Sequence, residues 1–294
     1  MDIDASDRYI PVIASEGTIS AAARKLGVSQ PAMSLALSQL EKKLGVQIFD
    51  RQSVPLQLTA EGRIYLHYLN LQKQLIDDCN RELAELNSDN VFDFSLGAPA
   101  IYAETMLLRS VISYRKLRSQ DHIHIKTAHL TRLAESVING TLDAFISTSN
   151  ELPPQIKSIY IKDEHLFFCR RSVPGKNNKS ALPDKDSEMI FMEDDQPLQK
   201  IINKYLKENG IPYKNHISVN QVSSALRLME AGQGTAIISE DALGILKSKK
   251  NIVITPLPAA LSSRKIYFAY NGERFMSEPL KIISGLLIKE NLKK

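Results

Sequence analysis

Two polar side chains, Gln30 and Ser34, stand one helical turn apart in a segment that begins with Ser29. A glutamine amide both donates and accepts hydrogen bonds, so it can pair bidentately with adenine, and a serine hydroxyl can reach bases or phosphates. Carried on the exposed side of one helix, the two side chains would suit the reading of base edges in a DNA groove. The chemistry that this pattern predicts is recognition of DNA.

The residues around this pair predict two short helices joined by a tight turn. Ala21–Ala23 are small, strong helix formers that let another helix approach closely. Gly27 suits the left-handed turn that ends a helix. Ser29 can cap the next helix, and Pro31 falls in its first turn, where a missing N–H costs nothing. The segment indicates a helix-turn-helix; the alternative is an ordinary helical hairpin whose alanines only pack.

Further motifs follow in order, and together they resemble the DNA-binding domain of LysR-type transcriptional regulators over about the first 60 residues. The motifs are Ser29-Gln30-Pro31-Ala32-Met33-Ser34, Leu40-Glu41-Lys42-Lys43-Leu44-Gly45, Phe49-Asp50-Arg51 and Leu58-Thr59-Ala60-Glu61-Gly62. The candidate DNA-binding residues are Ser20, Ser29, Gln30, Pro31, Ser34, Gln39, Arg51 and Gln52. A short two-stranded wing is expected around Pro55.

The chain departs from this family in its cationic contacts. Leu35 stands where a basic residue is frequent, and the wing segment Gln52–Gln57 has no arginine. Through residue 60 six basic side chains face six acidic ones, so net charge does not itself argue for DNA. We therefore expect a modest salt dependence of DNA binding.

The composition predicts a soluble, cytoplasmic protein of two or three domains. The chain has 294 residues, a formal net charge of +4 and 43% hydrophobic residues. Its N-terminus is acidic and without an apolar core, and no apolar run is long enough to span a membrane. Cys79 and Cys169 lie far apart and form no disulfide framework; a redox-sensing pair is the alternative.

A long helix from Thr59 to about residue 87 is expected to hold two chains together. Residues at spacings of four and three form a pattern typical of a coiled-coil seam, with Gln72 as its polar interruption: Tyr65, Leu69, Gln72, Ile76, Cys79, Leu83 and Leu86. A homodimer would present two DNA-reading helices to a site with dyad symmetry. The alternative is that the stripe packs against its own domain. A first amphipathic helix, Asp4 to Ala14, should bend at Pro11.

After a polar hinge near residues 87–90, strands and helices alternate, which predicts a parallel α/β sheet. Helices are expected at Thr105–Leu117 and Thr131–Asn139. The pattern resembles the two-lobed, periplasmic-binding-protein-like effector domain of the same family. The expected division is a winged helix-turn-helix domain at 1–58, a linker at 59–90, and an effector domain at 91–294, with subdomain I at 91–161 and 266–294 and subdomain II at 162–265.

A small-molecule effector is expected beyond the carboxyl ends of the strands, because open α/β sheets bind ligands there. The candidate residues are Pro99, Ala100, Ile101, Tyr102, His129, Thr131, Thr148, Asp195, Gln196 and Asn220. Thr131 has the alternative of capping the helix that follows it. Many family members place Ser or Thr, which holds a carboxylate, where this chain has Ala100. Asp194 and Asp195 also add negative charge, so an anionic, neutral or cationic effector remains open.

Catalytic, metal and cofactor sites find no support in the sequence. Gly232-Gln233-Gly234 follows a helix and lacks the third glycine of a dinucleotide site. His122 and His124 have no partner ligand at a suitable spacing. The expected function is transcriptional regulation without a cofactor, and the resemblance also implies a tetramer. An exported solute-binding protein and an enzyme that uses the two-lobed cleft are the rival classes.

Overall fold

The computed structural model divides the chain into two compact units, residues 1–86 and 87–294. It describes residues 7–85, 91–173, 178–193, 197–246, 248–257 and 263–291. Each unit has a hydrophobic core of its own.

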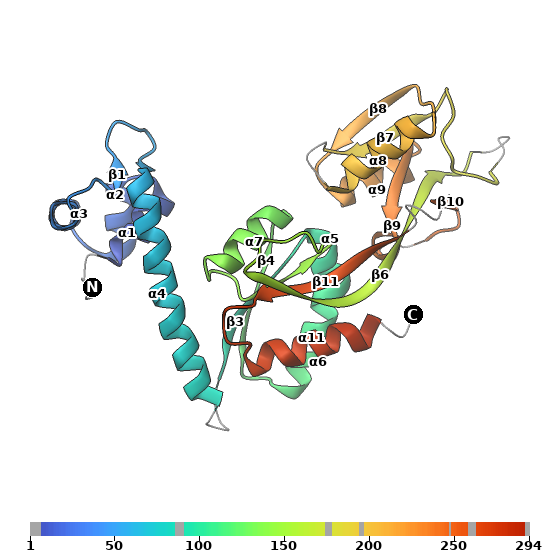
Figure 1. Ribbon diagram of the computed structural model, residues 1–294. Helices are drawn as coiled ribbons and strands as arrows, with labels where there is room; N and C mark the ends of the chain where they lie inside the picture. The colour runs from blue at the N-terminus through green and yellow to red at the C-terminus, as the bar shows by residue number, and fades with distance from the viewer. Residues whose placement is uncertain are drawn as a thin grey trace. The chain divides into compact units, whose positions relative to one another are not determined.

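The N-terminal unit is helical with a two-stranded wing (Figure 1). Its elements are α1 (Tyr9–Glu16), α2 (Ile19–Leu26), α3 (Gln30–Leu44), β1 (Phe49–Asp50), β2 (Gln57–Leu58) and α4 (Ala60–Glu85). β1 and β2 pair antiparallel, which confirms the predicted wing. The core under these elements is formed by Ile10, Ile13, Ala22, Ala23, Met33, Leu37, Leu40, Ile48 and Phe49.

The helix ends of this unit follow local signals in the sequence. The Oγ1 of Thr18 accepts a hydrogen bond from the Ala21 N–H at 3.2 Å, and the Oγ of Ser29 accepts one from Ala32 at 3.4 Å. Thr59 does the same for Gly62 at 2.9 Å and so starts α4 as expected. Gly27 ends α2 with a φ of 66°, a conformation that glycine adopts without a steric cost.

The first helix differs from its expected span. It begins at Tyr9, whereas the sequence pattern suggested Asp4, and residues 4–6 lie outside the described residues. Pro11 is therefore the third residue of α1. In the first turn a proline removes no intrahelical hydrogen bond, so the expected bend is not required.

The second unit alternates strands and helices, as the sequence pattern predicted. The strands are β3 (Asp93–Ala98), β4 (His122–Thr127), β5 (Ala144–Ser147), β6 (Ile156–Arg171), β7 (Glu188–Met192), β8 (Asn215–Val219), β9 (Thr235–Ser239), β10 (Ile252–Pro256) and β11 (Ser263–Asn271). The helices are α5 (Ala100–Tyr102), the π-helix η1 (Ala103–Leu107), α6 (Leu108–Leu117), α7 (Leu130–Ile138), α8 (Pro197–Glu208), α9 (Val222–Glu230), α10 (Glu240–Leu243) and α11 (Glu278–Asn291).

Two lobes share the long strands β6 and β11, which we call the crossing strands (Figure 1). In lobe I, β4, β3 and β5 are parallel, β11 pairs antiparallel with β5, and the first half of β6 pairs antiparallel with β11. In lobe II, β8, β7 and β9 are parallel, and β9 pairs antiparallel with the second half of β6, which also pairs with β10. The architecture is the expected two-lobed α/β domain.

Two helix starts differ from the sequence-based expectation. The helix expected from Thr105 begins earlier, because α5 and η1 run into α6 without a break from Ala100. The helix expected from Thr131 begins at Leu130, with His129 in the N-cap position and no side-chain cap. Thr131 therefore does not cap α7, and the alternative of a purely structural capping role for it is wrong.

A buried carboxylate ties the ends of lobe I together. Asp121 accepts hydrogen bonds from the backbone N–H of Phe92 at 3.0 Å, from Arg118 Nε at 2.8 Å and from the Tyr114 hydroxyl. Burial alone would raise the pKa of Asp121, but these hydrogen bonds outweigh burial and hold the pKa below its ordinary value. The ionised form of Asp121 therefore stabilises the folded lobe.

Asp121→Asn is expected to lower the free energy of unfolding by about 3 kcal/mol at pH 7, because it removes the buried carboxylate that pairs with the Arg118 guanidinium at 2.8 Å. A carboxyl group whose pKa is lowered by folding stabilises the folded state at pH values above the pKa of the unfolded chain, which is near 4. This stabilisation is lost as the pH falls below that value. The deficit should therefore shrink at pH 3. Urea unfolding followed by circular dichroism measures both, with the exposed Asp186→Asn as control; equal wild-type and Asp121→Asn midpoints at pH 7 would contradict the assignment.

Candidate functional site

The first turn of α3 presents a polar face that its own packing leaves open. Gln30 is exposed and Ser34 is half-buried, whereas Met33 and Leu37 are buried on the other side of the helix. Ser29 is engaged as the cap. The predicted residues Ser20, Pro31 and Gln39 lie at the surface around it. This face can insert into a groove without disturbing the core that holds it.

The wing is anchored by a carboxylate that the sequence analysis did not single out. Glu41 is buried, and its Oε1 accepts hydrogen bonds from the N–H groups of Ile48 at 2.9 Å and Phe49 at 3.3 Å. Arg51 Nη2 donates to Glu41 Oε2 at 2.8 Å and to Ser38 Oγ at 3.2 Å. The charge of Arg51 is therefore compensated by a buried carboxylate, while its own side chain stays exposed. Its best-supported role is to hold the wing against α3.

The outer surface of α4 differs from the predicted seam. Tyr65 and Leu69 pack against the core of their own unit. The predicted seam is therefore wrong for these two residues, and the alternative, packing within one domain, is confirmed for them. The exposed apolar residues of the helix, which we call the α4 stripe, are Ile64, Tyr68, Leu75, Ile76 and Leu83. Gln72 is half-buried, Cys79 is exposed, and Leu86 lies outside the described residues.

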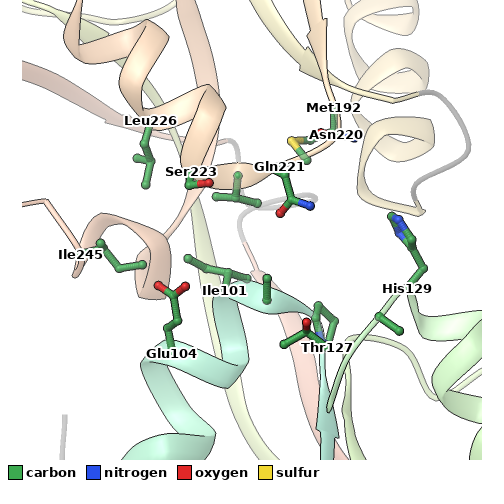
Figure 2. A pocket seen from close by; sticks show the side chains of 14 residues that line it. Ile101, Glu104, Thr127, His129, Met192, Asn220, Gln221, Ser223, Leu226 and Ile245 are labelled. Carbon is green, nitrogen blue, oxygen red and sulfur yellow. The ribbon is translucent and has the colours of Figure 1, made fainter. Parts of the chain in front are cut away.

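Between the lobes the second unit has a cleft with two compartments of about 360 and 330 Å³. Both are lined by Pro99, Ile101, His129, Met192 and Val222, so they are parts of one cavity. Figure 2 shows Ile101, Glu104, Thr127 and His129 on one side of the first compartment and Met192, Asn220, Gln221 and Ser223 on the other. The cleft lies beyond the carboxyl ends of the strands, where the sequence analysis expected a ligand.

Eight of the predicted effector residues line this cleft. They are Pro99, Ala100, Ile101, Tyr102, His129, Thr131, Thr148 and Asn220. The other two, Asp195 and Gln196, lie outside the described residues. The structure also brings in residues that the sequence analysis missed, among them Glu104, Lys200 and Arg264. Glu104 and Lys200 lie within a turn or two of a strand end, so their position in the sequence could have indicated a place at the cleft. No local sequence pattern indicates that Arg264 lies there.

Three helix N-termini at the cleft have no side-chain cap, as is also the case for α1 and α6. The N-cap positions Pro99, His129 and Gln221 make no side-chain cap hydrogen bond. At α10, away from this lining, Ser239 Oγ accepts a hydrogen bond from Ala242 at 3.4 Å. The first-turn N–H groups of a helix without a cap remain available to a ligand, and the helix dipole favours negative charge there.

A buried group of charged side chains joins the second compartment to the crossing strands. Glu164 Oε2 accepts hydrogen bonds from Tyr102 at 2.6 Å and Arg264 Nε at 2.8 Å. Burial would raise the pKa of Glu164, but Arg264 and Tyr102 hold it below its ordinary value. Burial raises the pKa of Asp241, although Lys162 Nζ lies 2.7 Å from its Oδ2. We call these five residues the hinge cluster.

The remaining candidate chemistry is not supported by the geometry. Cys169 is buried in β6, and burial raises the pKa of its thiol to about 12, so it stays protonated and unreactive at neutral pH. Cys79 is exposed on α4, and both cysteines are free. Among the described residues no group of three or more metal-binding side chains comes together. Within that same part of the chain, no helix is both long and apolar enough to cross a membrane.

Comparison with known proteins identifies both units. Residues 8–63 match the family of bacterial regulatory helix-turn-helix proteins of the lysR family, and residues 93–289 match the LysR substrate binding domain. A probable RuBisCO transcriptional regulator of Guillardia theta is 26% identical, with 94% of each chain covered. One from Porphyra purpurea is 28% identical over 94% of this chain and 92% of its own.

Solved structures share the fold. A full-length OxyR variant from Pseudomonas aeruginosa has a TM-score of 0.70 at 19% identity and covers 96% of both chains. CbnR in complex with its target DNA has a TM-score of 0.66 at 18% identity, over 97% of this chain and 98% of its own. The helix-turn-helix match excludes the rival classes of solute-binding protein and enzyme. The chain belongs to the LysR family and is a DNA-binding transcriptional regulator with a two-lobed effector-binding domain.

Proposed function

We propose that this regulator binds promoter DNA of dyad symmetry as a homodimer and that a small molecule in the interlobe cleft controls the binding. The observation that carries the DNA part is the first turn of α3, where Gln30 is exposed and Ser34 half-buried while the opposite face is held by the core. Ser20, Ser29, Pro31, Gln39 and Gln52 are proposed to contact the backbone or neighbouring bases. Arg51 is proposed to contact the DNA from the edge of the wing.

Dimerisation through the helix of residues 59–87 is part of the proposal. The α4 stripe supports it, because Leu75 and Leu83 are 72% and 57% exposed in the single chain. Isolated helices rarely leave such a row of apolar side chains in water without a partner. A dimer would place two reading helices about one DNA turn, or a multiple of it, apart. The family resemblance extends this to a homotetramer in the cytoplasm.

The division of labour follows the proposed domains. Residues 1–58 would read DNA, residues 59–90 would link and dimerise, and residues 91–294 would bind the effector. Within the last, subdomain I takes 91–161 and 266–294, and subdomain II takes 162–265. An effector that binds one arrangement of the lobes more tightly shifts the population towards it and so changes the spacing of the reading helices. An effector with equal affinity for both arrangements would change nothing.

Gln30→Ala tests the reading helix. Loss of a bidentate contact to adenine should cost about 1–3 kcal/mol at one position of each half-site and relax the preference there. Duplexes selected from a random library by the wild-type protein provide the sites, and mobility shifts with single-base variants measure the preference. Gln120→Ala, an exposed amide in the other unit, is the matched control. If the Gln30→Ala protein discriminates among site variants as the wild type does, Gln30 does not read a base.

A further inference from the structure

Arg264 lies on β11 and lines the second compartment of the cleft. No other described residue of β11 lines it. Its side chain is 20% exposed. Nε is bound to Glu164, and Nη2 donates to the Tyr102 hydroxyl. Nη1 makes no hydrogen bond or ion pair with any residue that the structure describes. One edge of the guanidinium is thus held in place, and donors on its other edge remain for a ligand.

The hinge cluster fixes the position of this guanidinium. Arg264 and Lys162 are the cations of the cluster, and Glu164 and Asp241 are its carboxyls. Lys162 Nζ pairs with Asp241 Oδ2 at 2.7 Å, and Glu164 is shared between Arg264 and Tyr102. Such a preorganised, partly buried guanidinium is a strong receptor for an oxyanion.

Further donors line the same compartment from both lobes. Lys200 of α8 in lobe II is exposed and forms no ion pair with a described carboxylate. Thr131 and Thr148 contribute hydroxyl groups from lobe I, and α7 begins there without a side-chain cap. The described residues that line this compartment include no carboxylate. Lys200, Arg264 and the two hydroxyl groups therefore offer donors to a negatively charged group.

The first compartment has the opposite character. Its described lining contains the exposed carboxylate of Glu104 together with Asn220, Gln221 and Ser223, and no lysine or arginine. Glu104 points into the space between the lobes in Figure 2. A carboxylate and side-chain amides accept hydrogen bonds from hydroxyl or amino groups. The charged side chains that line the two compartments thus have opposite sign, although the compartments share five lining residues.

We propose that the effector is a small polar molecule with a carboxylate or phosphate group, which Arg264 receives in the second compartment, and with hydroxyl or amino groups that face Glu104 in the first. This inference rests on the proposed function of the cleft and names the class of its ligand. The oxyanion would be held by Lys200 from lobe II, by Thr131 and Thr148 from lobe I and by Arg264 from a crossing strand. Binding would therefore favour the arrangement in which both lobes reach the same group.

The full-length protein is tested by isothermal titration calorimetry with glycerol 3-phosphate and succinate as oxyanion probes, and with glycerol and succinamide as their uncharged counterparts. We expect at least one oxyanion probe to bind and its counterpart to bind at least tenfold more weakly. Arg264→Met should lower the affinity for the bound probe at least tenfold. Lys265→Met, which removes a charge from the neighbouring exposed residue of the same strand, should leave it unchanged.

Lys200→Met is the second variant, for the case that Arg264→Met does not fold. Because Lys200 is exposed, its replacement should not disturb folding, and a loss of affinity of about fivefold or more is expected. Equal affinities in wild type, Arg264→Met and Lys200→Met would overturn the inference, as would counterparts that bind as tightly, or no binding of either oxyanion at millimolar concentration. Phosphate-only or carboxylate-only binding tells which oxyanion is recognised, and either supports the proposal. Mobility shifts with the selected duplexes separate the two proposals, since the variants should still bind DNA even where the ligand inference fails.

Discussion

Gly62→Ala is expected to destabilise the N-terminal unit by about 3 kcal/mol, although alanine is the better helix former. A Cβ at this position of α4 would lie 2.0 Å from the carbonyl oxygen of Ile48 and 2.9 Å from its carbonyl carbon. Both are backbone atoms next to the wing, so neither can rotate away. The helix must move off the core, and DNA binding should fall with the loss of folded protein.

The control for this substitution is Gly285→Ala in α11. Gly285 is also helical, but a Cβ there has no neighbour within 4 Å. Alanine should then stabilise the protein by about 0.5–1 kcal/mol through helix propensity alone. Urea unfolding followed by circular dichroism reports both changes, since the chain contains no tryptophan for fluorescence. Opposite signs are expected; a Gly62→Ala protein as stable as Gly285→Ala would show that α4 does not dock on the wing as described.

Replacing Leu75 and Leu83 together by glutamate is expected to convert the proposed dimer into monomers and to abolish tight DNA binding. Both residues belong to the α4 stripe, so the new carboxylates of both chains would be buried in the proposed interface. An unpaired buried charge and like-charge repulsion both oppose association. Because the two side chains are exposed in one chain, the fold of each monomer should be retained.

Analytical ultracentrifugation measures the outcome directly. Lys73→Glu adds negative charge to the same helix but lies two residues, or about 200°, from Leu75, on the other side of the helix. It should leave the dimer intact. Leu69→Glu is a different experiment, because Leu69 packs into the core of its own unit and its replacement should unfold that unit. An intact dimer in the Leu75→Glu, Leu83→Glu protein would show that α4 is not the interface.

The partition of α4 shows where sequence periodicity stops being informative. The spacings of four and three correctly indicated an apolar side along the helix. They did not indicate that Tyr65 and Leu69 are buried by the core of their own unit while Leu75 and Leu83 are not. Periodicity gives the direction of an apolar face but not the surface that covers it, because that surface comes from other parts of the chain.

Local residue patterns were enough to predict the helix-turn-helix, the caps at Ser29 and Thr59, the wing and the alternation of strands and helices. These depend on neighbours three or four residues away, or on the alternation within single elements. It also located most of the cleft, because strand ends in an open α/β sheet meet at one edge.

The pairing of charged side chains, by contrast, depends on how distant segments of the chain fold together. Glu41 joins Arg51 across the wing, and Arg264 meets Glu164 and Tyr102, which lie 100 and 162 residues away in the chain. Arg264 meets Glu164 because β6 and β11 pair antiparallel with these two residues opposite each other. Their geometry depends on long-range register, which no local pattern of residue types contains.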